Sequence, residues 1–389
     1  MKVFYVNMLK VINFLRWAAG RLIIRTSSGF TIIRHPEYRN TFHGYYDVSC
    51  FNPKNPDILL LHVTNASMFK RPDPTKPLYV VVWDRNKSIE LYKSSPIYSW
   101  NWQQGARATW VNNETIIYNT YDTQSGTYRA IKVNIMTGDL LFYKYPVQSI
   151  CNDYIVSIDY AWMSNIRRDY GYFNRQVNKP SYGLILLDFK GQKLLELPYD
   201  IINKKITKSY GQNVEKLKVN HVLISDDCET ILFLIRYFVN GERITDLAQC
   251  SRDGNWSVIL RNCNLSHYCF VTNDKILASI SYKGKFGWAI INLNGKIITF
   301  KSNVDGHPFK IGVDSYICDT SPSKFKVRYL YKMNESLLAS SEIFSYREYW
   351  KLNGEIRVDM HPTASKNGAN VQVDLCDSKH RFVGLLNIP

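Results

Sequence analysis

The chain has 389 residues, of which 45% are apolar and 21% charged, a composition that excludes wholesale disorder and allows a large buried core. It carries 49 Lys and Arg against 33 Asp and Glu, a formal net charge of +16, so its surface attracts polyanions such as nucleic acid, anionic lipid or acidic polysaccharide. No RNP-like motif, zinc-finger spacing or dense basic block accompanies this charge, so nucleic acid is not expected as a partner. Aromatic residues make up 14% of the chain, which suits β-strands, and Tyr and Trp also offer stacking faces to sugars.

Eight cysteines stand singly in the chain, several of them within predicted strands, and no C-x-x-C motif occurs. A structural zinc site or a redox motif is therefore not expected. Buried free thiols are typical of a reducing compartment, so we expect a cytoplasmic protein; paired disulfides stay the alternative, because the number of cysteines is even. The eight are Cys50, Cys151, Cys228, Cys250, Cys263, Cys269, Cys318 and Cys376.

The first 24 residues carry apolar side chains at helical spacing, among them Met8, Ile12 and Leu15. Lys10 and Arg16 interrupt this stretch, which stays below the ~20 apolar residues that a spanning helix needs and fits a signal peptide poorly. Residues 1–24 are predicted to form a basic amphipathic helix. Either it lies on an anionic membrane surface, at the inner face of the membrane, or it packs against the rest of the protein.

The stretch from His221 to Arg261 is the clearest copy of a repeated unit. A His precedes a short apolar run, a polar turn follows at 225–229, and further β-rich runs are separated by turns at Asn240-Gly241 and 251–254. Four short strands in roughly 40–50 residues are typical of one propeller blade. Degenerate copies fill the rest of the chain, with openings near His43, Gln103, Asn152, His267, Gly306 and Met360.

The last unit stops at Pro389 one strand short, whereas a spare β-rich segment, Phe30–Arg34, precedes the first unit. A propeller must close its ring, and a blade that takes strands from both ends of the chain closes it without any further element. We therefore predict an all-β fold, a seven-bladed β-propeller over residues 30–389. An N-terminal strand closes it by pairing with the last blade, and the short amphipathic helix of residues 1–24 precedes it.

Five of the eight histidines head the innermost strand of a unit. Inner strands line the central channel, so these imidazoles are expected to converge at one channel mouth. Neutral imidazoles suit a borderline divalent ion such as Mn²⁺, Zn²⁺ or Fe²⁺. For each one singly, a hydrogen bond to a neighbouring loop is the structural alternative. The five are His43, His221, His267, His307 and His361, and the second unit offers Gln103 or Gln104 near the same register.

Arginines and tyrosines fall in loops and strand ends on the same predicted face. Arg pairs with carboxylates through two parallel hydrogen bonds, and Tyr supplies a stacking ring and a hydroxyl, so together they predict a site for an acidic sugar. Singly, each Arg is equally typical of a solvated surface. The residues are Arg107, Arg167, Arg168, Arg236, Arg243 and Arg357, with Tyr46, Tyr170, Tyr172 and Tyr237.

Several units carry spaced short motifs: Asp305-Gly306-His307-Pro308 with Asp319-Thr320-Ser321-Pro322, Asp359-Met360-His361-Pro362 with Asn367-Gly368, and Asn220-His221 with Arg236 and Gly241-Glu242-Arg243. In these motifs the chain from about His43 onward resembles seven-bladed propellers of the oligogalacturonate lyase type, which are related to TolB-like repeats. The resemblance implies a manganese ion held by histidines and a glutamine, and cleavage of uronate chains by β-elimination. In that chemistry the metal and an Arg neutralise the carboxylate, and a His removes the adjacent proton.

His307 and His361 match the late-blade histidines of that family, and His221 matches a His that opens a middle blade. The family's cluster of a Gln with paired histidines has no counterpart here. This departure leaves lyase activity open, whereas the fold and the acidic-glycan interpretation do not depend on it.

These observations assign roles to three groups of residues. Catalytic roles go to His221, Arg236 and Arg243, and a divalent metal, manganese by the resemblance, to His267, His307 and His361. Contacts to an acidic oligosaccharide or polysaccharide go to His43, Tyr46, Gln104, Arg107, Arg168 and Tyr172. The expected function is that of a metal-assisted, lyase-like enzyme. The alternative is a non-catalytic or glycosyltransferase-associated propeller in bacterial-type surface polysaccharide assembly.

Overall fold

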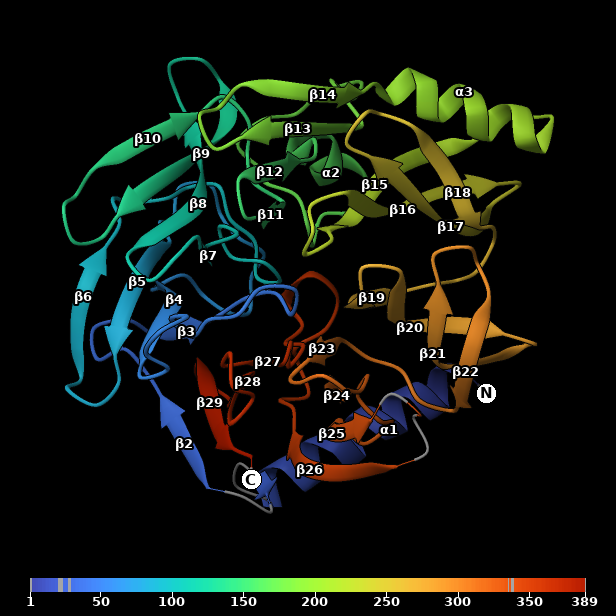
Figure 1. The fold of residues 1–389 in the computed structure, drawn as a ribbon. Coiled ribbons are helices and arrows are strands. Elements are labelled where there is room, and N and C mark those ends of the chain that lie inside the picture. Colours follow the sequence, from blue (N-terminus) through green and yellow to red (C-terminus); the bar gives the residue numbers. More distant parts are fainter. Residues whose placement is uncertain (1, 20–23, 27–28, 335, 337–338, 389) are drawn as a thin grey trace. The chain divides into compact units, whose positions relative to one another are not determined.

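The computed structural model describes residues 2–19, 24–26, 29–334, 336 and 339–388. These residues form seven antiparallel sheets, six with four strands and one with five (Figure 1). Each sheet is built mainly from strands that follow one another in the chain, as in the blades of a propeller. The predicted seven-bladed β-propeller is therefore confirmed.

The chain divides into two compact units. The first comprises residues 1–96, 102–105 and 305–389 and contains blades one, six and seven. The second comprises residues 97–101 and 106–304 and contains blades two to five.

The blades of the first unit carry the strands from both ends of the chain. Blade one is β3(Asn40–Phe42), β4(Ile58–Thr64), β5(Tyr79–Asp84) and β6(Ile89–Lys93). Blade six is β23(Pro308–Lys310), β24(Ser315–Asp319), β25(Val327–Asn334) and β26(Ser340–Arg347), extended by β1(Ile24–Thr26). Blade seven is β27(Thr363–Ala364), β28(Asn370–Cys376) and β29(Arg381–Asn387), completed by β2(Phe30–Ile33).

The predicted closure is present, because β2 pairs with β29 from Phe30 opposite Leu386 to Ile33 opposite Val383. A side chain at Gly384 would come within 2.7 Å of the Phe30 ring, so the glycine makes room for that ring. The strand β1 was not predicted. It is only three residues long and shows no alternation that would mark it, and its first residue, Ile24, lies within the segment predicted to be helical.

The N-terminal helix α1(Lys2–Ala19) contacts blade six through one side. The amide Nδ2 of Asn13 donates to the carbonyl of Lys324 at 3.1 Å, and the Phe14 ring packs edge-on against Trp350. Its other side exposes Met8, Val11 and Leu15, which lie three and four residues apart. None of the described helices is long and apolar enough to cross a membrane. The helix therefore combines packing with an exposed apolar row.

The blades of the second unit follow one another along the chain. Blade two is β7(Thr109–Trp110), β8(Thr115–Asp122), β9(Thr127–Asn134) and β10(Leu140–Tyr143), and blade three is β11(Ser149–Cys151), β12(Tyr154–Ser157), β13(Leu184–Asp188) and β14(Lys193–Leu197). Blade four is β15(Glu215–Ile224), β16(Thr230–Val239), β17(Glu242–Ser251) and β18(Trp256–Leu260), and blade five is β19(His267–Thr272), β20(Lys275–Tyr282), β21(Lys285–Asn292) and β22(Ile297–Ser302).

Two helices were not predicted in this unit. At the start of the helix α2(Tyr160–Ile166), the Asp159 carboxylate caps the first turn by accepting from the backbone N–H of Trp162 at 3.0 Å. The helix α3(Tyr199–Tyr210) follows Pro198 and ends at Gly211 in the left-handed region. The short 3₁₀ turn η1(Gly354–Ile356) lies in the first unit.

A disulfide joins blades three and four. Cys151 at the end of β11 bonds to Cys228 in the turn between β15 and β16, across 77 residues of chain, whereas the other six cysteines are free. The expectation of free thiols is therefore wrong for this pair. Sequence spacing could not reveal it, because the two residues meet only through the packing of neighbouring blades. Disulfides are typical of oxidising compartments.

Replacing both Cys151 and Cys228 by Ala should lower the free energy of unfolding by about 4 kcal/mol, because the bond closes a long loop in the unfolded chain. Thermal or urea unfolding with and without dithiothreitol measures this. The reductant should lower the melting temperature of the wild-type protein and leave that of the double variant unchanged. A reductant that changes neither protein would contradict the disulfide.

Candidate functional site

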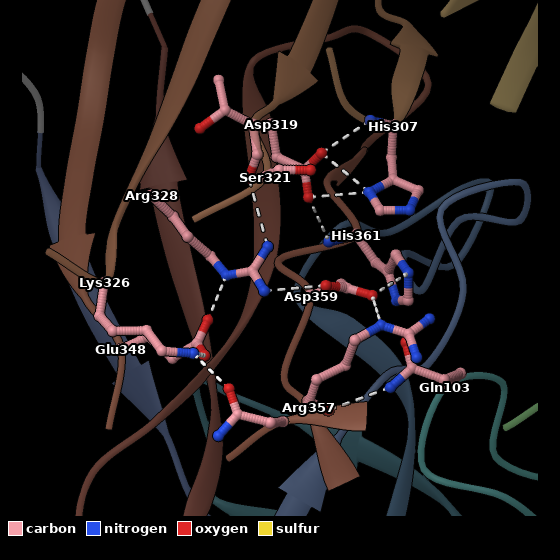
Figure 2. A network of polar contacts seen from close by, with 12 residues as sticks. Gln103, His307, Asp319, Ser321, Lys326, Arg328, Glu348, Arg357, Asp359 and His361 are labelled. Atoms are coloured by element: carbon pink, nitrogen blue, oxygen red, sulfur yellow. Dashed lines mark hydrogen bonds and ion pairs between the residues drawn. The ribbon is translucent and has the colours of Figure 1, made fainter. Parts of the chain in front are cut away.

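In the first unit, one buried carboxylate holds two of the predicted histidines (Figure 2). Asp319 ends β24 and is fully buried. One of its oxygens accepts the backbone N–H of His307 at 2.7 Å, and the other accepts that of His361 at 3.2 Å. The ring nitrogen Nδ1 of His307 also lies 2.9 and 3.1 Å from the two oxygens. Asp319 thereby fixes the openings of blades six and seven together.

The hydrogen bonds of the two rings set the nitrogen that each presents. Nδ1 of His307 donates to Asp319, and Nδ1 of His361 donates to the carbonyl of Gly44 at 2.5 Å. These donations place the proton of each neutral imidazole on Nδ1 and the lone pair on Nε2. Histidines that bind metals commonly use their second nitrogen in this way. The two ring centroids are 4.5 Å apart, and the rings are nearly perpendicular.

Asp359 completes the group. His307, Asp359 and His361, all buried, each offer one ligand atom, and these atoms lie within 4.8 Å of one another. Nε2 of His361 has no hydrogen-bond partner among the described residues and lies 3.9 Å from Oδ2 of Asp359. Two imidazole nitrogens and a carboxylate oxygen form a donor set that suits Mn²⁺, Zn²⁺ or Fe²⁺. The residues present therefore fit a divalent metal.

Two arginines keep Asp359 ionised. Nε of Arg357 donates to Oδ2 at 2.6 Å, and Nη2 of Arg328 donates to Oδ1 at 2.9 Å (Figure 2). Burial raises the pKa of Asp359, but the charges of Arg357 and Arg328 outweigh burial and hold the pKa well below its usual range. A metal ion at Oδ2 would share that oxygen with Arg357.

Arg328 is itself held on its other side. Its Nε donates to the buried Glu348 at 2.5 Å, and its Nη1 donates to the carbonyl of Thr320 at 3.2 Å. Lys326 adds a second cation to Glu348 at 3.2 Å. This network fixes the guanidinium that faces Asp359, so the carboxylate of Asp359 is positioned before any ligand arrives.

His361 is held in its neutral form. Burial lowers the pKa of His361 well below its usual range, and the neighbouring His307 lowers it further, against the raising effect of Asp359. A neutral imidazole is the form that binds metals.

The backbone at these openings is unusual. Gly306, directly before His307, has φ = +138°, and a Cβ there would lie 1.6 Å from the carbonyl oxygen of Asp319. His361 has φ = +44°, and His221 and Arg107 also lie in the left-handed region at corresponding blade openings. Such strain in residues other than glycine concentrates at functional sites, so it favours a binding role for these openings.

Two tyrosines of the segment 43–47 pack against the histidine pair. The ring of Tyr46 lies 5.1 Å from that of His307, and the ring of Tyr45 lies 4.8 Å from that of His361. Nε2 of Gln103 donates to the carbonyl of Arg357 at 3.0 Å, whereas the predicted Gln104 packs its backbone over Gly44. Of the predicted residues, the structure thus brings His307, His361 and Tyr46 together.

His43 has a packing role. Its ring nitrogens lie 3.3 and 2.9 Å from the carbonyls of Leu60 and Val48, and the side chain is almost fully buried. Its backbone N–H and that of Gly44 donate to the buried carboxylate of Asp374. Burial raises the pKa of Asp374 to about 7, against the lowering effect of these two donors. His43 therefore shares the register of the other histidines, but its ring contacts backbone carbonyls of neighbouring segments, which is the structural role given above as the alternative.

The second unit contains another histidine pair, His221 and His267. The sequence predicted a catalytic role for the first and a metal-binding role for the second. The rings of His221 and His267 meet edge-on at 4.9 Å, and Tyr170 packs against His221 at 5.6 Å. The guanidinium of the buried Arg236 donates to the carbonyls of Leu265 and Ser266, whereas Arg243 is exposed at the start of β17. The two pairs are each formed within one unit, so a metal shared by His267, His307 and His361 stays a prediction.

Three predicted substrate contacts in the second unit lie in different environments. Arg107 is buried and donates to the carbonyl of Gln148, and Arg168 is exposed. Tyr172 is fully buried, stacks on Tyr160 at 4.4 Å, and accepts from Nδ2 of Asn119 at 3.0 Å. Tyr172 therefore packs the core and offers no ring face to a ligand.

A cavity of about 570 Å³ lies elsewhere in the second unit, between blades two and three. It contains none of the predicted site residues. Aromatic and charged side chains line it, among them Tyr128, Phe142, Tyr145, Tyr182, Arg129 and Arg175. This cavity lies apart from the histidine pair of the second unit. The donor set of His307, Asp359 and His361 makes that group, and not the cavity, the candidate metal site.

Asp319 and Asp359 were not among the predicted site residues. The sequence carries a signal for the second, because Asp359 stands only two residues before His361. Asp319 was not predicted because it is separated in sequence from both His307 and His361, which it contacts only in the folded protein.

No protein-family model matches the chain. No curated protein matches its sequence. Among solved structures, an oligogalacturonate lyase in complex with manganese shares the fold with a TM-score of 0.62 at 14% identity, covering 95% of this chain and 96% of the other. An oligogalacturonate lyase from Vibrio parahaemolyticus follows with a TM-score of 0.59 at 12% identity, covering 95% and 99%. TolB from Acinetobacter baumannii matches with a TM-score of 0.41 at 12% identity, over 82% and 78%.

The two lyases share the propeller fold with this chain, as the sequence motifs indicated. At such identities the likeness shows the fold alone. The chemistry of the chain therefore rests on its own residues.

Replacing Gly306 by Ala should lower the free energy of unfolding by about 2 kcal/mol or more, because the added carbon meets the Asp319 carbonyl in a backbone conformation that favours glycine. Gly284→Ala is the matched control, since it also has positive φ but open space around it. Urea unfolding compares the two variants. Equal losses would show that the contact with Asp319 is unimportant.

Proposed function

We propose that this protein binds a divalent metal ion at His307, Asp359 and His361, and that this centre binds the carboxylate of an acidic glycan. One observation carries the proposal: two buried imidazoles present Nε2 beside a carboxylate that two arginines keep ionised. A bound metal would supply positive charge to a substrate carboxylate and thereby acidify the adjacent C–H bond. Manganese is the proposed ion, because the lyase with TM-score 0.62 is described in complex with manganese.

The chain's own residues supply the rest of the binding chemistry. The guanidinium of Arg357 lies at the edge of the centre, about a fifth exposed, and is suited to pair with a carboxylate. The buried tyrosine pair Tyr45 and Tyr46 fixes the histidine rings from one side. The net charge of +16 attracts an acidic chain from solution.

The proposed reaction is lyase-like β-elimination on a uronate chain. A base removes the proton next to the carboxylate, the electrons form a carbon–carbon double bond, and the glycosidic C–O bond on the neighbouring carbon breaks. The leaving sugar oxygen takes up a proton. His221, with Arg236 and Arg243, stays the proposed source of the base and of carboxylate contacts, on sequence grounds.

The second candidate is a non-catalytic or glycosyltransferase-associated propeller that binds glycan in surface polysaccharide assembly. It is favoured by the state of Asp359, whose two oxygens each already hold a guanidinium. It is favoured also by the lack of the Gln-and-paired-His cluster that the resemblance implies. The formation of a conjugated double bond from oligouronates, followed by ultraviolet absorbance, separates the two candidates.

A membrane face remains the proposed location. The exposed row Met8, Val11 and Leu15 of α1, with Lys10 beside it, suits an anionic lipid surface. The proposed cytoplasmic side and the disulfide Cys151–Cys228 point to different redox environments. The redox state of this cysteine pair in cells, measured by alkylation, tests on which side of the membrane the protein lies.

His307→Ala and His361→Ala should each lower the affinity for Mn²⁺ at least about 10–100-fold, because each removes one imidazole ligand. Metal content after dialysis and titration with Mn²⁺ measure the loss. His380→Ala is the control, since this partly exposed His lies in a turn of the same unit and pairs with Asp377. Wild-type affinity in both site variants would refute the metal centre.

Val11→Glu together with Leu15→Glu should reduce sedimentation with anionic vesicles at low salt, because the variant places charge on the exposed apolar row. Ile201→Glu on α3 is the control, as it changes a similarly exposed apolar residue on another helix. Equal sedimentation of all three proteins would show that α1 only packs against blade six.

A further inference from the structure

Blade four carries a row of buried polar side chains on one sheet face. Lys218 on β15 lies directly opposite Arg236 on β16, and Arg236 lies opposite Thr245 on β17. Asn220, two residues after Lys218, points to the same face, and the register between them is regular. Residues paired in this way have Cβ atoms only about 5 Å apart. The four side chains thus form one compact patch, 1–5% exposed.

Three of these side chains lack partners of their own. The amide of Asn220 has neither a donor nor an acceptor within the described chain, and the same holds for the hydroxyl of Thr245. The side-chain amine of Lys218 forms no hydrogen bond or ion pair with any described residue. Buried polar groups are almost always hydrogen-bonded, so the unpartnered amide of Asn220 and hydroxyl of Thr245, beside the amine of Lys218, point to a ligand that supplies the missing partners.

The charge of the surroundings gives the chemistry of that ligand. Arg236 faces Lys218 across the strands, Arg167 follows α2, and Arg243 is the second residue of β17. A carboxylate nearby is that of Asp169, which accepts from Arg167 at 2.7 and 3.1 Å. His221 and His267 lie at the adjoining blade openings. Like charges placed opposite each other on a sheet are destabilising, and a buried unpaired cation is more so. The patch therefore favours an anion.

The protonation of Lys218 agrees with this. Burial, together with the charges of Arg236, Arg167 and Arg243, lowers the pKa of Lys218 to about 7, against the raising effect of Asp169. Without an anion the amine is therefore mostly neutral above pH 8. An anion beside it would restore its proton.

We propose that Lys218, Asn220 and Thr245, with Arg236 opposite, form an oxyanion-binding site in the second unit. The ammonium of Lys218 and the Nδ2 of Asn220 donate to the anion, and the Thr245 hydroxyl and the Oδ1 of Asn220 bind a neighbouring hydroxyl or water. The shared chemistry is that of a carboxylate on a uronic acid or a free inorganic oxyanion such as sulfate. The site is independent of the centre at His307 and His361, and it requires no metal.

Calorimetric titration of the whole protein in EDTA tests the site, with sodium galacturonate, sodium sulfate and sodium chloride at equal ionic strength. Binding at pH 8 should take up about one proton per protein, measured in buffers of different ionisation enthalpy, and at pH 6 much less. If galacturonate binds and sulfate does not, the ligand of the site is a sugar carboxylate. If both bind, the site accepts oxyanions in general. Binding of neither above chloride overturns the proposal, whatever the metal site does.

Lys218→Met should weaken this binding about tenfold or more and abolish the proton uptake, because it removes the charged donor while keeping the volume. It should raise the melting temperature without anion, since a desolvated cation is lost. Lys216→Met, an exposed lysine on the same strand, is the control and should bind as the wild type does. Asn220→Leu gives a second test through the amide. Wild-type binding and uptake in both Lys218→Met and Asn220→Leu would overturn the site.

Discussion

The buried carboxylate of Asp319 accepts backbone N–H groups from the openings of two successive blades, and the candidate centre depends on this arrangement. Asp319 is the fifth residue of the second strand in its blade. Asp374 holds the fifth place in β28 and accepts from His43 and Gly44, and Asn119 holds it in β8 and exchanges two hydrogen bonds with Val147. A polar side chain at one register thus ties each of these blades to the start of the next.

This arrangement explains why the side chains at the blade openings are held in fixed orientations. The blade opening must turn back on itself to reach the buried acceptor, which accounts for Gly306 and for the left-handed backbone of His361. Once the backbone is fixed there, the side chain at the opening is fixed too. Where that side chain is His and its Nδ1 finds an acceptor in the protein, Nε2 is left as a ligand atom. His307 and His361 meet this condition, whereas both ring nitrogens of His43 lie against carbonyls.

The sequence predicted the blades well because their long strands alternate or are bounded by turn residues. The unit from His221 to Arg261 contains the predicted turns, and the pairing of Phe30 with the last blade followed from a missing strand. Three-residue strands such as β1 carry too little pattern. The helix α3 was missed because seven of its twelve residues are charged or polar and only Ile202 and Ile206 are buried. Of the candidate centre, the sequence indicated His307 and His361 but neither Asp359 nor Asp319. The role of Asp319 was hidden because a register shared between blades is visible only once they pack.

The pairing of β2 with β29 has a consequence for how the protein is made. The two strands are separated by about 350 residues, which a ribosome adds in roughly 20–70 s. Throughout that time β2 has no native partner, and its unpaired edge can bind other strands. Its brevity, at four residues, limits that danger. The last blade can therefore be completed only once β29 has been synthesised.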